Sequence, residues 1–457
     1  MTARRLHLGL MFWATGTHPA GWRHPGARAD GAYDIGFIQQ VSRIAEDAAF
    51  DFVFLGDRLA TDPALARTNP AQMSRLEPFT AGAAIAAATS RIGIVVTANP
   101  TYHDPYSVAR LTASLDHLSR GRASWNLVTG ADAAAAGNFS RSEHWDTDKR
   151  YDRAGEFVDV VRALWDSGAH GAPIGHRGAH FEVDGPLDVP RPPQGQVVLL
   201  HAGTSERSRD LAAREADVVF SGHHDFESAR EYYADVKARA AAHGREPGLP
   251  RILPGLSVHT GATTQDAVAE HDLLNSFLPL DEEEQLAGPL HRGGALGQRP
   301  RRNLTSVSRE LGVDVRGHDP DEQVPAALAD ELDEQGRVLL DAVRAHTHRD
   351  LSGEHRITYR DLVNGLGTGA GRASVVGDPV QVADFVQRWF DGGAADGFNI
   401  FPPHVPGSVR AFADLVVPEL RRRGLHRDDY AGSTFRDHLG LDVPPVRAAA
   451  AGRTTAP

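Results

Sequence analysis

IGIVVTANPTYHDPYSVARLTASLDHLSRGRASWNLVTG, residues 92–130, predicts one complete unit of strand, helix and second strand. Residues 92–96 are a continuous β-branched apolar run, which is typical of a parallel strand covered on both faces. Asp104-Pro105 then opens a helix, because Asp can cap free backbone N–H groups and Pro suits the first helical position. Residues 119–122 end the helix, and residues 123–128 form the next strand. The apolar face of the helix is expected at Val108, Leu111, Leu115 and Leu118.

Two parallel strands joined by a helix place their carboxyl ends at the same edge of the sheet, where ligands of such folds bind. In this unit those ends are residues 97–99 and 126–130. Both are polar, and we therefore expect a functional site at this edge.

The same alternation continues along the whole chain. Further strands are expected at residues 6–12, 52–55, 197–200, 218–220, 251–258 and 397–401. The helices are expected after a cap at Asp34, at residues 78–89, 151–165 and 206–215, through Tyr232 and Val236, and after Asp378-Pro379. Eight strand–helix units running in one direction predict an α/β fold, a TIM-type (β/α)8 barrel with insertions.

Two segments interrupt this rhythm. Residues 168–195 are dense in Gly, Pro and His, and residues 278–351 form a long acidic insertion before the last strand. We expect a single barrel domain over residues 1–441 that contains both insertions. The tail, residues 442–457, is rich in Ala, Arg and Pro and is expected to be disordered.

Composition excludes several classes of function. The 457 residues include 48 Lys and Arg against 60 Asp and Glu, a formal net charge of −12, which argues against a nucleic-acid partner. The absence of Cys excludes disulfides, thiolate metal ligands and a cysteine nucleophile. No apolar run approaches the ~20 residues that cross a bilayer. The first residues are basic and then apolar, but no small-residue cleavage site follows, so a buried strand is favoured over a signal peptide. We expect a cytoplasmic protein.

Polar residues follow several of the predicted strands. They are Asp57, Arg58, and residues 97–103, 126–130, 203–205 and 402–404. The loop Gly203-Thr204-Ser205 is the most specific of them, because a helix with free N–H groups and a positive dipole end follows it, as in phosphate sites. Thr204 or Ser205 acting only as the helix cap is an equally good interpretation.

Other chemistries lack their motifs. Neither HExxH nor GxSxG is present. His176 and His180 are four residues apart, but they stand in a Gly-rich loop, so no metal site is expected there. Gly367, Gly369 and Gly371 follow a helix-like segment and not a strand, so they lack the context of a dinucleotide fingerprint.

The chain resembles the bacterial-luciferase-like flavin-dependent monooxygenases, in the branch of the nitrilotriacetate, EDTA and dibenzothiophene-sulfone monooxygenases. The segments that carry the resemblance are THPAGWRHPG, FDFVFLGDRLA, LEPFTAGAAIAAATSRIGI, ARLTASLDHLSRGRASWNLVTG, RYDRAGEFVDVVRALW, GPLDVPRPPQGQ, GGAADGFNI, VVPELRRRGL and FRDHLGL. They are long, stand in the family's order and span residues 6–441.

The resemblance implies an FMN-dependent two-component monooxygenase, in which a separate NAD(P)H-dependent flavin reductase supplies reduced FMN. By similarity, the flavin-site positions are Asp57, Thr97, Asn126, Tyr151 and Ser205, joined by the neighbouring Thr204, with Tyr151 and Ser205 near the phosphate. His18 and Phe54 match positions that line the substrate side of the flavin. The chain departs from the family at His201, where Gln is usual, and at Ser208, where Gly is usual.

The chemistry that the resemblance implies is oxygenation of a small organic substrate through a C4a-peroxyflavin, which survives only where water is excluded. The insertion at residues 278–351 is long enough to act as a lid. His18 is the candidate catalytic residue, as a donor to the peroxide or as its positioner, against the alternative of a loop histidine that bonds its own backbone. His346 and His348 are candidates for a further histidine that some relatives take from the insertion.

Two other functions stay open. One is a deazaflavin-dependent oxidoreductase of the same superfamily, and the other is a flavin-binding protein without catalysis. Related proteins form dimers or tetramers, so a homo-oligomer is expected.

Overall fold

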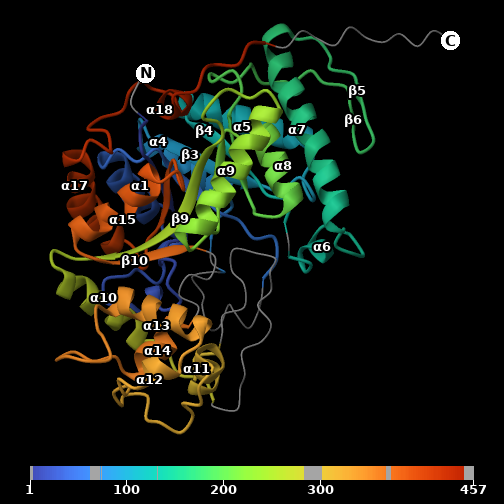
Figure 1. Ribbon diagram of the computed structural model, residues 1–457. Helices are drawn as coiled ribbons and strands as arrows, with labels where there is room; N and C mark the ends of the chain where they lie inside the picture. Colours follow the sequence, from blue (N-terminus) through green and yellow to red (C-terminus); the bar gives the residue numbers. More distant parts are fainter. Residues whose placement is uncertain are drawn as a thin grey trace.

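Eight parallel strands close into a barrel in the computed structural model, which describes residues 4–61, 73, 75–130, 132–282, 301–366 and 372–446 (Figure 1). Each strand pairs with the next around the ring, and the last pairs with the first. The strands are β1 His7–Met11, β2 Phe52–Leu55, β3 Gly93–Ala98, β4 Ala123–Leu127, β7 Val198–Ala202, β8 Val218–Ser221, β9 Arg251–Thr260 and β11 Gly397–Phe401. The predicted TIM-type (β/α)8 barrel is confirmed.

Helices cover the outside of this barrel. They are α1 Ile35–Asp47, α4 Pro78–Ala88, α5 Pro105–Ser119, α7 Thr147–His170, α8 Glu206–Glu215, α9 Phe226–Ala242 and α15 Pro379–Asp391. Local signals explain where they begin: the Asp34 side chain accepts from Phe37 N–H, and Asp378 forms a capping box with Gln381. Asp104 is the N-cap of α5, but its side chain accepts no capping hydrogen bond.

The predicted apolar face of α5 is wrong in two positions. Leu111 and Leu118 are 44% and 68% exposed. The buried face is instead made largely of small and polar residues, because α5 packs closely between α4 and α7. Thr112 Oγ1 donates to the Val108 carbonyl at 2.6 Å, and Trp165 Nε1 of α7 donates to Thr112 Oγ1 at 3.2 Å. A satisfied hydroxyl can therefore lie where the spacing of leucines predicts an apolar contact.

The interior of the barrel is packed with apolar side chains and closed at one end. Inward-facing residues of the strands form a core with Phe435 and Leu439 of α18 (Phe435–Leu439). The Phe435 and Phe52 ring centroids are 5.7 Å apart, and Phe52 is the first residue of β2. Helix α18 thus plugs the end where the strands begin, so that a site can open only at their carboxyl ends.

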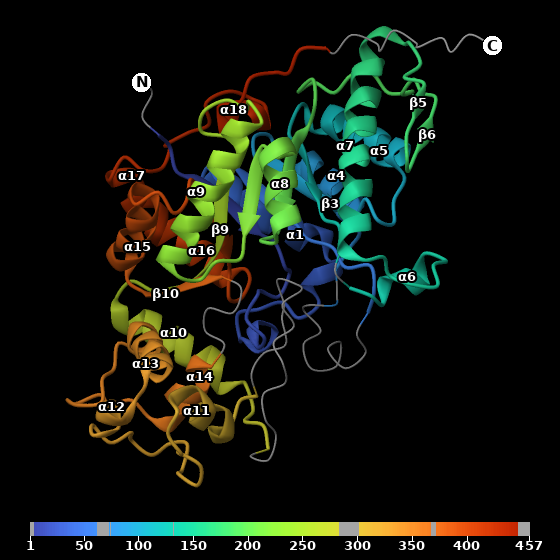
Figure 2. The same ribbon diagram turned by 45° about the vertical axis from the view of Figure 1, so that its right-hand side comes forward.

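A second hydrophobic core lies beyond the carboxyl ends of the strands. It is built from α11 Leu304–Leu311, α12 Leu328–Glu331, α13 Glu334–Thr347 and α14 Tyr359–Gly365. In both views these helices stand on the opposite side of the molecule from the chain's N-terminus, next to α10 Thr264–Ser276 (Figures 1 and 2). We call this part the helical subdomain.

Strand β9 reaches out of the barrel toward the helical subdomain. It pairs with β8 up to Pro254 and with β10 (Ala373–Gly377) from Leu256 to Thr260. Leu256 pairs with both β10 and β11. Strand β10 therefore hydrogen-bonds to the same edge of β9 as β8, further along the strand. Strand β10 was not predicted, because only two of its five residues are β-branched apolar residues.

The other insertion forms a small hairpin along α7. Its strands are β5 His176–Arg177 and β6 Glu182–Val183, and Glu156 of α7 accepts from the backbone N–H groups of His180 and Phe181. His176 Nε2 lies 2.9 Å from the same carboxylate. The triplet Gly367, Gly369 and Gly371 lies outside the described residues. No described helix has both the length and the apolar character that a membrane crossing requires.

Candidate active site

Three predicted residues lie on neighbouring strands at the open end of the barrel. Thr97 pairs with Asn126 in the register of β3 and β4, and Asn126 Nδ2 donates to Thr97 Oγ1 at 2.9 Å. Thr97 Oγ1 in turn donates to the carbonyl of Leu55, the last residue of β2, at 2.8 Å. Asp57 follows that strand, and burial raises the pKa of its carboxyl group. The structure therefore places Thr97 and Asn126 in contact, with Asp57 two residues beyond the carbonyl that Thr97 binds.

A second group lies at the end of β7. Ser205 caps α8, since its Oγ accepts from Ser208 N–H, and the Gly203 carbonyl accepts from the Tyr232 hydroxyl at 2.9 Å. A Cβ placed on Gly203 would lie 3.7 Å from the Tyr151 hydroxyl, which shows that Tyr151 of α7 reaches this loop. Thr204 and Ser205 are exposed. Tyr151, Thr204 and Ser205 thus surround the N-terminus of α8, where N–H groups and the dipole favour an anion.

The two departures from the family pattern contact each other. His201 Nδ1 donates to the Leu127 carbonyl at 2.8 Å, so the neutral ring carries its proton there. Its Nε2 accepts from the Ser208 hydroxyl at 2.9 Å. Burial lowers the pKa of His201 to about 4, which keeps the ring neutral. The pair joins the end of β7 to the first turn of α8 and so supports the loop that holds Thr204 and Ser205.

His18 stands at one end of a row of histidines. Its ring centroid is 6.3 Å from that of His259, which is 5.1 Å from His271, which is 6.0 Å from His346 of α13. The Ala20 N–H donates to His18 Nδ1 at 3.2 Å, which is the backbone bond of the alternative interpretation. That bond also leaves the proton of the neutral ring on Nε2.

The two histidine candidates of the insertion differ in position. His346 is buried, donates from Nδ1 to the Ala342 carbonyl at 2.6 Å and belongs to the row. His348 ends α13 and donates from Nε2 to the Val376 carbonyl of β10 at 2.8 Å. Only His346 therefore lies in line with His18.

His259 is the member of the row that the sequence analysis missed. It is 5% exposed, and its Nδ1 has no hydrogen-bond partner among the described residues. Desolvation and the neighbouring imidazoles lower its pKa well below the ordinary value, so the ring is neutral. Its position directly after the strand predicted at residues 251–258 was the signal that could have found it.

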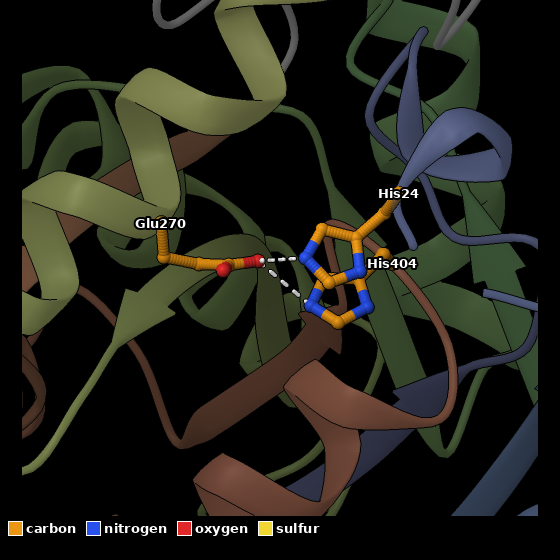
Figure 3. Close-up of side chains that lie close together, drawn as sticks. All are labelled: His24, Glu270 and His404. Carbon is orange, nitrogen blue, oxygen red and sulfur yellow. Dashed lines mark ion pairs between the residues drawn. The ribbon is translucent and has the colours of Figure 1, made fainter. Parts of the chain in front are cut away.

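A carboxylate and two imidazoles meet beside this row. Glu270 Oε1 lies 2.8 Å from His404 Nε2 and 3.3 Å from His24 Nε2, and the two rings stack at 3.7 Å (Figure 3). His and Glu are common metal ligands. However, His24 Nδ1 accepts from Gly26 N–H at 3.0 Å, so the proton of neutral His24 is on Nε2. His24 Nε2 therefore donates to Glu270 and has no lone pair for a metal ion.

Buried polar atoms without partners gather at the open end of the barrel. They include atoms of residues at or just after four strands: Trp13 Nε1, Asn126 Oδ1, Ser221 Oγ and His259 Nδ1. Unpaired buried polar atoms are costly, and a polar ring system bound here would satisfy some of them. Together with the anion site at α8, this donor and acceptor set fits FMN, whose phosphate would lie at α8. Phe54, predicted beside the substrate, is buried in the barrel core, with its ring 6.3 Å from that of Phe220.

The fold and the site define a (β/α)8 barrel whose polar side chains gather at the carboxyl ends of its strands, beside the N-terminus of α8. The sequence model of the luciferase-like monooxygenases matches residues 11–396. The chain belongs to this family.

Relatives with known activities agree with the predicted branch. The chain is 38% identical to nitrilotriacetate monooxygenase component A of Aminobacter aminovorans, covering 96% of this chain and 97% of that protein. It is 35% identical to dibenzothiophene-sulfone monooxygenase of Rhodococcus erythropolis (strain XP), covering 97% and 98%. The solved EDTA monooxygenase of Chelativorans sp. BNC1 superposes with a TM-score of 0.74 at 29% identity, covering 97% of this chain and 100% of that one. The chain is an oxygenating enzyme of a flavin-dependent type.

Proposed function

We propose that this protein is the oxygenating component of a two-component monooxygenase that uses reduced FMN and O2 on a small organic substrate. The observation that carries the proposal is the pair of Thr97 and Asn126. Asn126 is 2% exposed and donates from Nδ2 to Thr97 Oγ1, while its Oδ1 has no partner in the part of the chain that the structure describes. A buried amide oxygen facing a barrel mouth needs a donor, and a flavin ring offers N–H groups.

The residues around the open end of the barrel form two groups, one for the flavin ring and one for its phosphate. Asp57, Thr97 and Asn126 would hold the flavin ring, and Tyr151, Thr204 and Ser205 would hold its phosphate. Bound reduced FMN supplies the electrons that activate O2.

His18 and the helical subdomain serve the substrate side. His18 carries a proton on Nε2 when its ring is neutral, because Nδ1 accepts from the Ala20 N–H, so it can donate a hydrogen bond to an oxygen atom at the substrate side and position that atom. The helical subdomain packs on β9 and β10 through α10 and α13. We propose that it acts as the lid that keeps water from the site.

The partner and the assembly follow from the same family. The relative from Aminobacter aminovorans is named component A, which supports a separate NAD(P)H-dependent flavin reductase as the source of reduced FMN. We propose a dimer or tetramer of this chain, which light scattering after size exclusion would measure.

Fluorescence titration tests the cofactor. Purified protein is titrated with oxidised FMN, with anaerobically reduced FMN and with the deazaflavin coenzyme. Much tighter binding of reduced FMN is the expected result, and Asn126→Ala weakens it about tenfold, the equivalent of one lost buried hydrogen bond of ~1.4 kcal/mol. Asn138→Ala, at an exposed asparagine of α6 (Ala135–Asn138), is the matched control. Binding of the deazaflavin alone, or of no flavin, would overturn the proposal.

A further inference from the structure

Arg372 lies at the open end of the barrel on the side away from the phosphate corner. It directly precedes β10, and its guanidinium carbon is 5.0 Å from the ring centroid of Phe401, the last residue of β11. Its Nη2 lies 3.5 Å from the carbonyl of Thr17, the residue before His18. Gly255 of β9 leaves it room, since a Cβ there would be 3.2 Å from the Arg372 Cβ.

The strand order sets Arg372 apart from the flavin phosphate. Around the ring, β7 stands four strands from β1 in either direction, so the two lie opposite each other. Arg372 contacts the segments that follow β11 and β1, whereas Thr204 and Ser205 follow β7. An anion held by Arg372 is therefore a different group from the phosphate.

The guanidinium is short of partners among the described residues. Its one hydrogen bond there, to Thr17, is at the limit of length, and no described carboxylate forms an ion pair with it. Three other arginines that are buried have a carboxylate partner or several acceptors: Arg427 pairs with Asp51, Arg436 pairs with Asp217, and Arg122 donates to five oxygens. Burial lowers the pKa of Arg372 to about 10, so it stays charged at neutral pH.

Among the described residues, no charged group compensates Arg372, since burial alone shifts the pKa of its guanidinium. Phe401 stacks with Phe220, at 5.6 Å, and meets Trp13 edge-on at 6.4 Å, so the wall beside the guanidinium is aromatic. A half-buried cation of this kind is stabilised by a planar anion that accepts two parallel N–H bonds.

We propose that Arg372 binds a carboxylate group of the substrate and thereby orients it against His18. The proposal rests on the proposed function, because it takes the mouth of the barrel as the place of oxygenation. It names the substrate class as small carboxylic acids whose remaining atoms pack on the aromatic wall. Arg372 is then a specificity-determining residue contributed by β10, a strand that stands outside the eight-stranded ring.

Calorimetric titration of wild type, Arg372→Gln and Arg372→Lys tests this assignment. The probes are succinate, propane-1,2,3-tricarboxylate and nitrilotriacetate, each beside its uncharged amide, with and without saturating FMN. At least one carboxylate is expected to bind wild type about ten- to a hundredfold more tightly than Arg372→Gln, as for the loss of a charge-assisted hydrogen bond. The affinity of Arg372→Lys for the carboxylate is expected to lie between those of wild type and Arg372→Gln, because an ammonium point charge replaces the two parallel N–H donors of the guanidinium. The amides bind wild type and variants alike.

Arg388→Gln is the matched control, because Arg388 also covers a phenylalanine, Phe226, at 4.8 Å, but is exposed on α15. It should bind like wild type. Equal binding of every carboxylate to wild type and Arg372→Gln, or no binding to wild type, overturns the proposal. Weakened FMN binding in Arg372→Gln with unchanged carboxylate binding assigns the residue to the flavin and also overturns it. If FMN does not bind wild type, the proposed function fails, whereas the titrations without FMN still decide the role of Arg372.

Discussion

Replacing Ser208 by Ala removes the donor that satisfies a buried imidazole. Ser208 Oγ lies 2.9 Å from His201 Nε2, and His201 is 1% exposed, so water cannot replace the lost hydroxyl. An unsatisfied buried acceptor costs about 1–3 kcal/mol. Because Ser to Ala leaves no cavity of note, we expect the free energy of unfolding to fall by about 2 kcal/mol, the middle of that range.

The matched control is Ser228→Ala. Ser228 occupies the same third position of α9 that Ser208 occupies in α8, but it is partly exposed and bonds Asp225 beside solvent. We expect its replacement to change the free energy by about 0.5 kcal/mol or less. Urea unfolding followed by tryptophan fluorescence and circular dichroism measures both variants at neutral pH.

A double-mutant cycle isolates the bond itself. His201→Gln and the double variant His201→Gln/Ser208→Ala complete the cycle with Ser208→Ala. The loss of unfolding free energy in the double variant should be at least about 1 kcal/mol smaller than the sum of the losses in the two single variants, because each single change removes the same contact. Additive losses, or a Ser208→Ala variant as stable as Ser228→Ala, would show that the hydrogen bond contributes nothing and refute the reasoning.

The remaining predictions concern pH, catalysis and metal. The pKa of His201 falls from 6.5 to about 4 on folding, so the unfolded chain binds the extra proton and stability is lost as pH falls below 6.5. Between about pH 7.5 and about pH 5, the free energy of unfolding of wild type should fall by about 2 kcal/mol more than that of His201→Gln. Equal losses in the two proteins would contradict this prediction. His18→Ala should keep its FMN affinity and lose about a hundredfold in substrate oxygenation, with more peroxide released; unchanged turnover would exclude His18 from catalysis. Treatment with the chelator phenanthroline should leave the melting midpoint of the protein unchanged. Glu270→Ala should lower the midpoint, because it removes the carboxylate that faces His24 and His404. Bound zinc in an equimolar amount would contradict the proton assigned to His24 Nε2.

The barrel could be predicted because each of its units is specified locally. β-branched runs bounded by caps such as Asp34 and Asp378 require no knowledge of distant residues, and the strands at residues 52–55 and 397–401 match the prediction to the residue. The buried face of α5 could not be predicted in the same way. Helix packing against α4 and α7 selected small and polar side chains there, and a leucine pattern carries no information about those neighbours.

The candidate site could be predicted where it depends on strand ends. Thr97 and Asn126 follow from the register of two adjacent strands. The histidine row could not, since His18, His259 and His346 come from a loop, a strand and a helix of the subdomain that only the tertiary fold brings together. Strand β10, and with it Arg372, was missed because its sequence ASVVG contains only two adjacent β-branched apolar residues, too short a run to predict a strand.

His201 and Ser208, which the sequence presents as two separate departures from the family, are one change in physical terms. Glycine at position 208 has no side chain that could donate to residue 201, whereas the Ser208 hydroxyl donates to His201 Nε2. Ser205 remains the cap of α8. The departure therefore lies behind the phosphate loop and not in the mouth.

The mouth of the barrel divides into two halves with different chemistry. The half formed by β2, β3, β4 and β7 presents an amide, hydroxyls and a helix N-terminus, which suit a flavin and its phosphate. The half formed by β9, β11 and β1 presents the neutral imidazole of His259, aromatic rings and one arginine. Substitutions in the first half should therefore alter cofactor affinity alone, and substitutions in the second should alter substrate use alone. A variant of Arg372 that lost both, while Asn126→Ala lost neither, would show that the two ligands do not lie in separate halves.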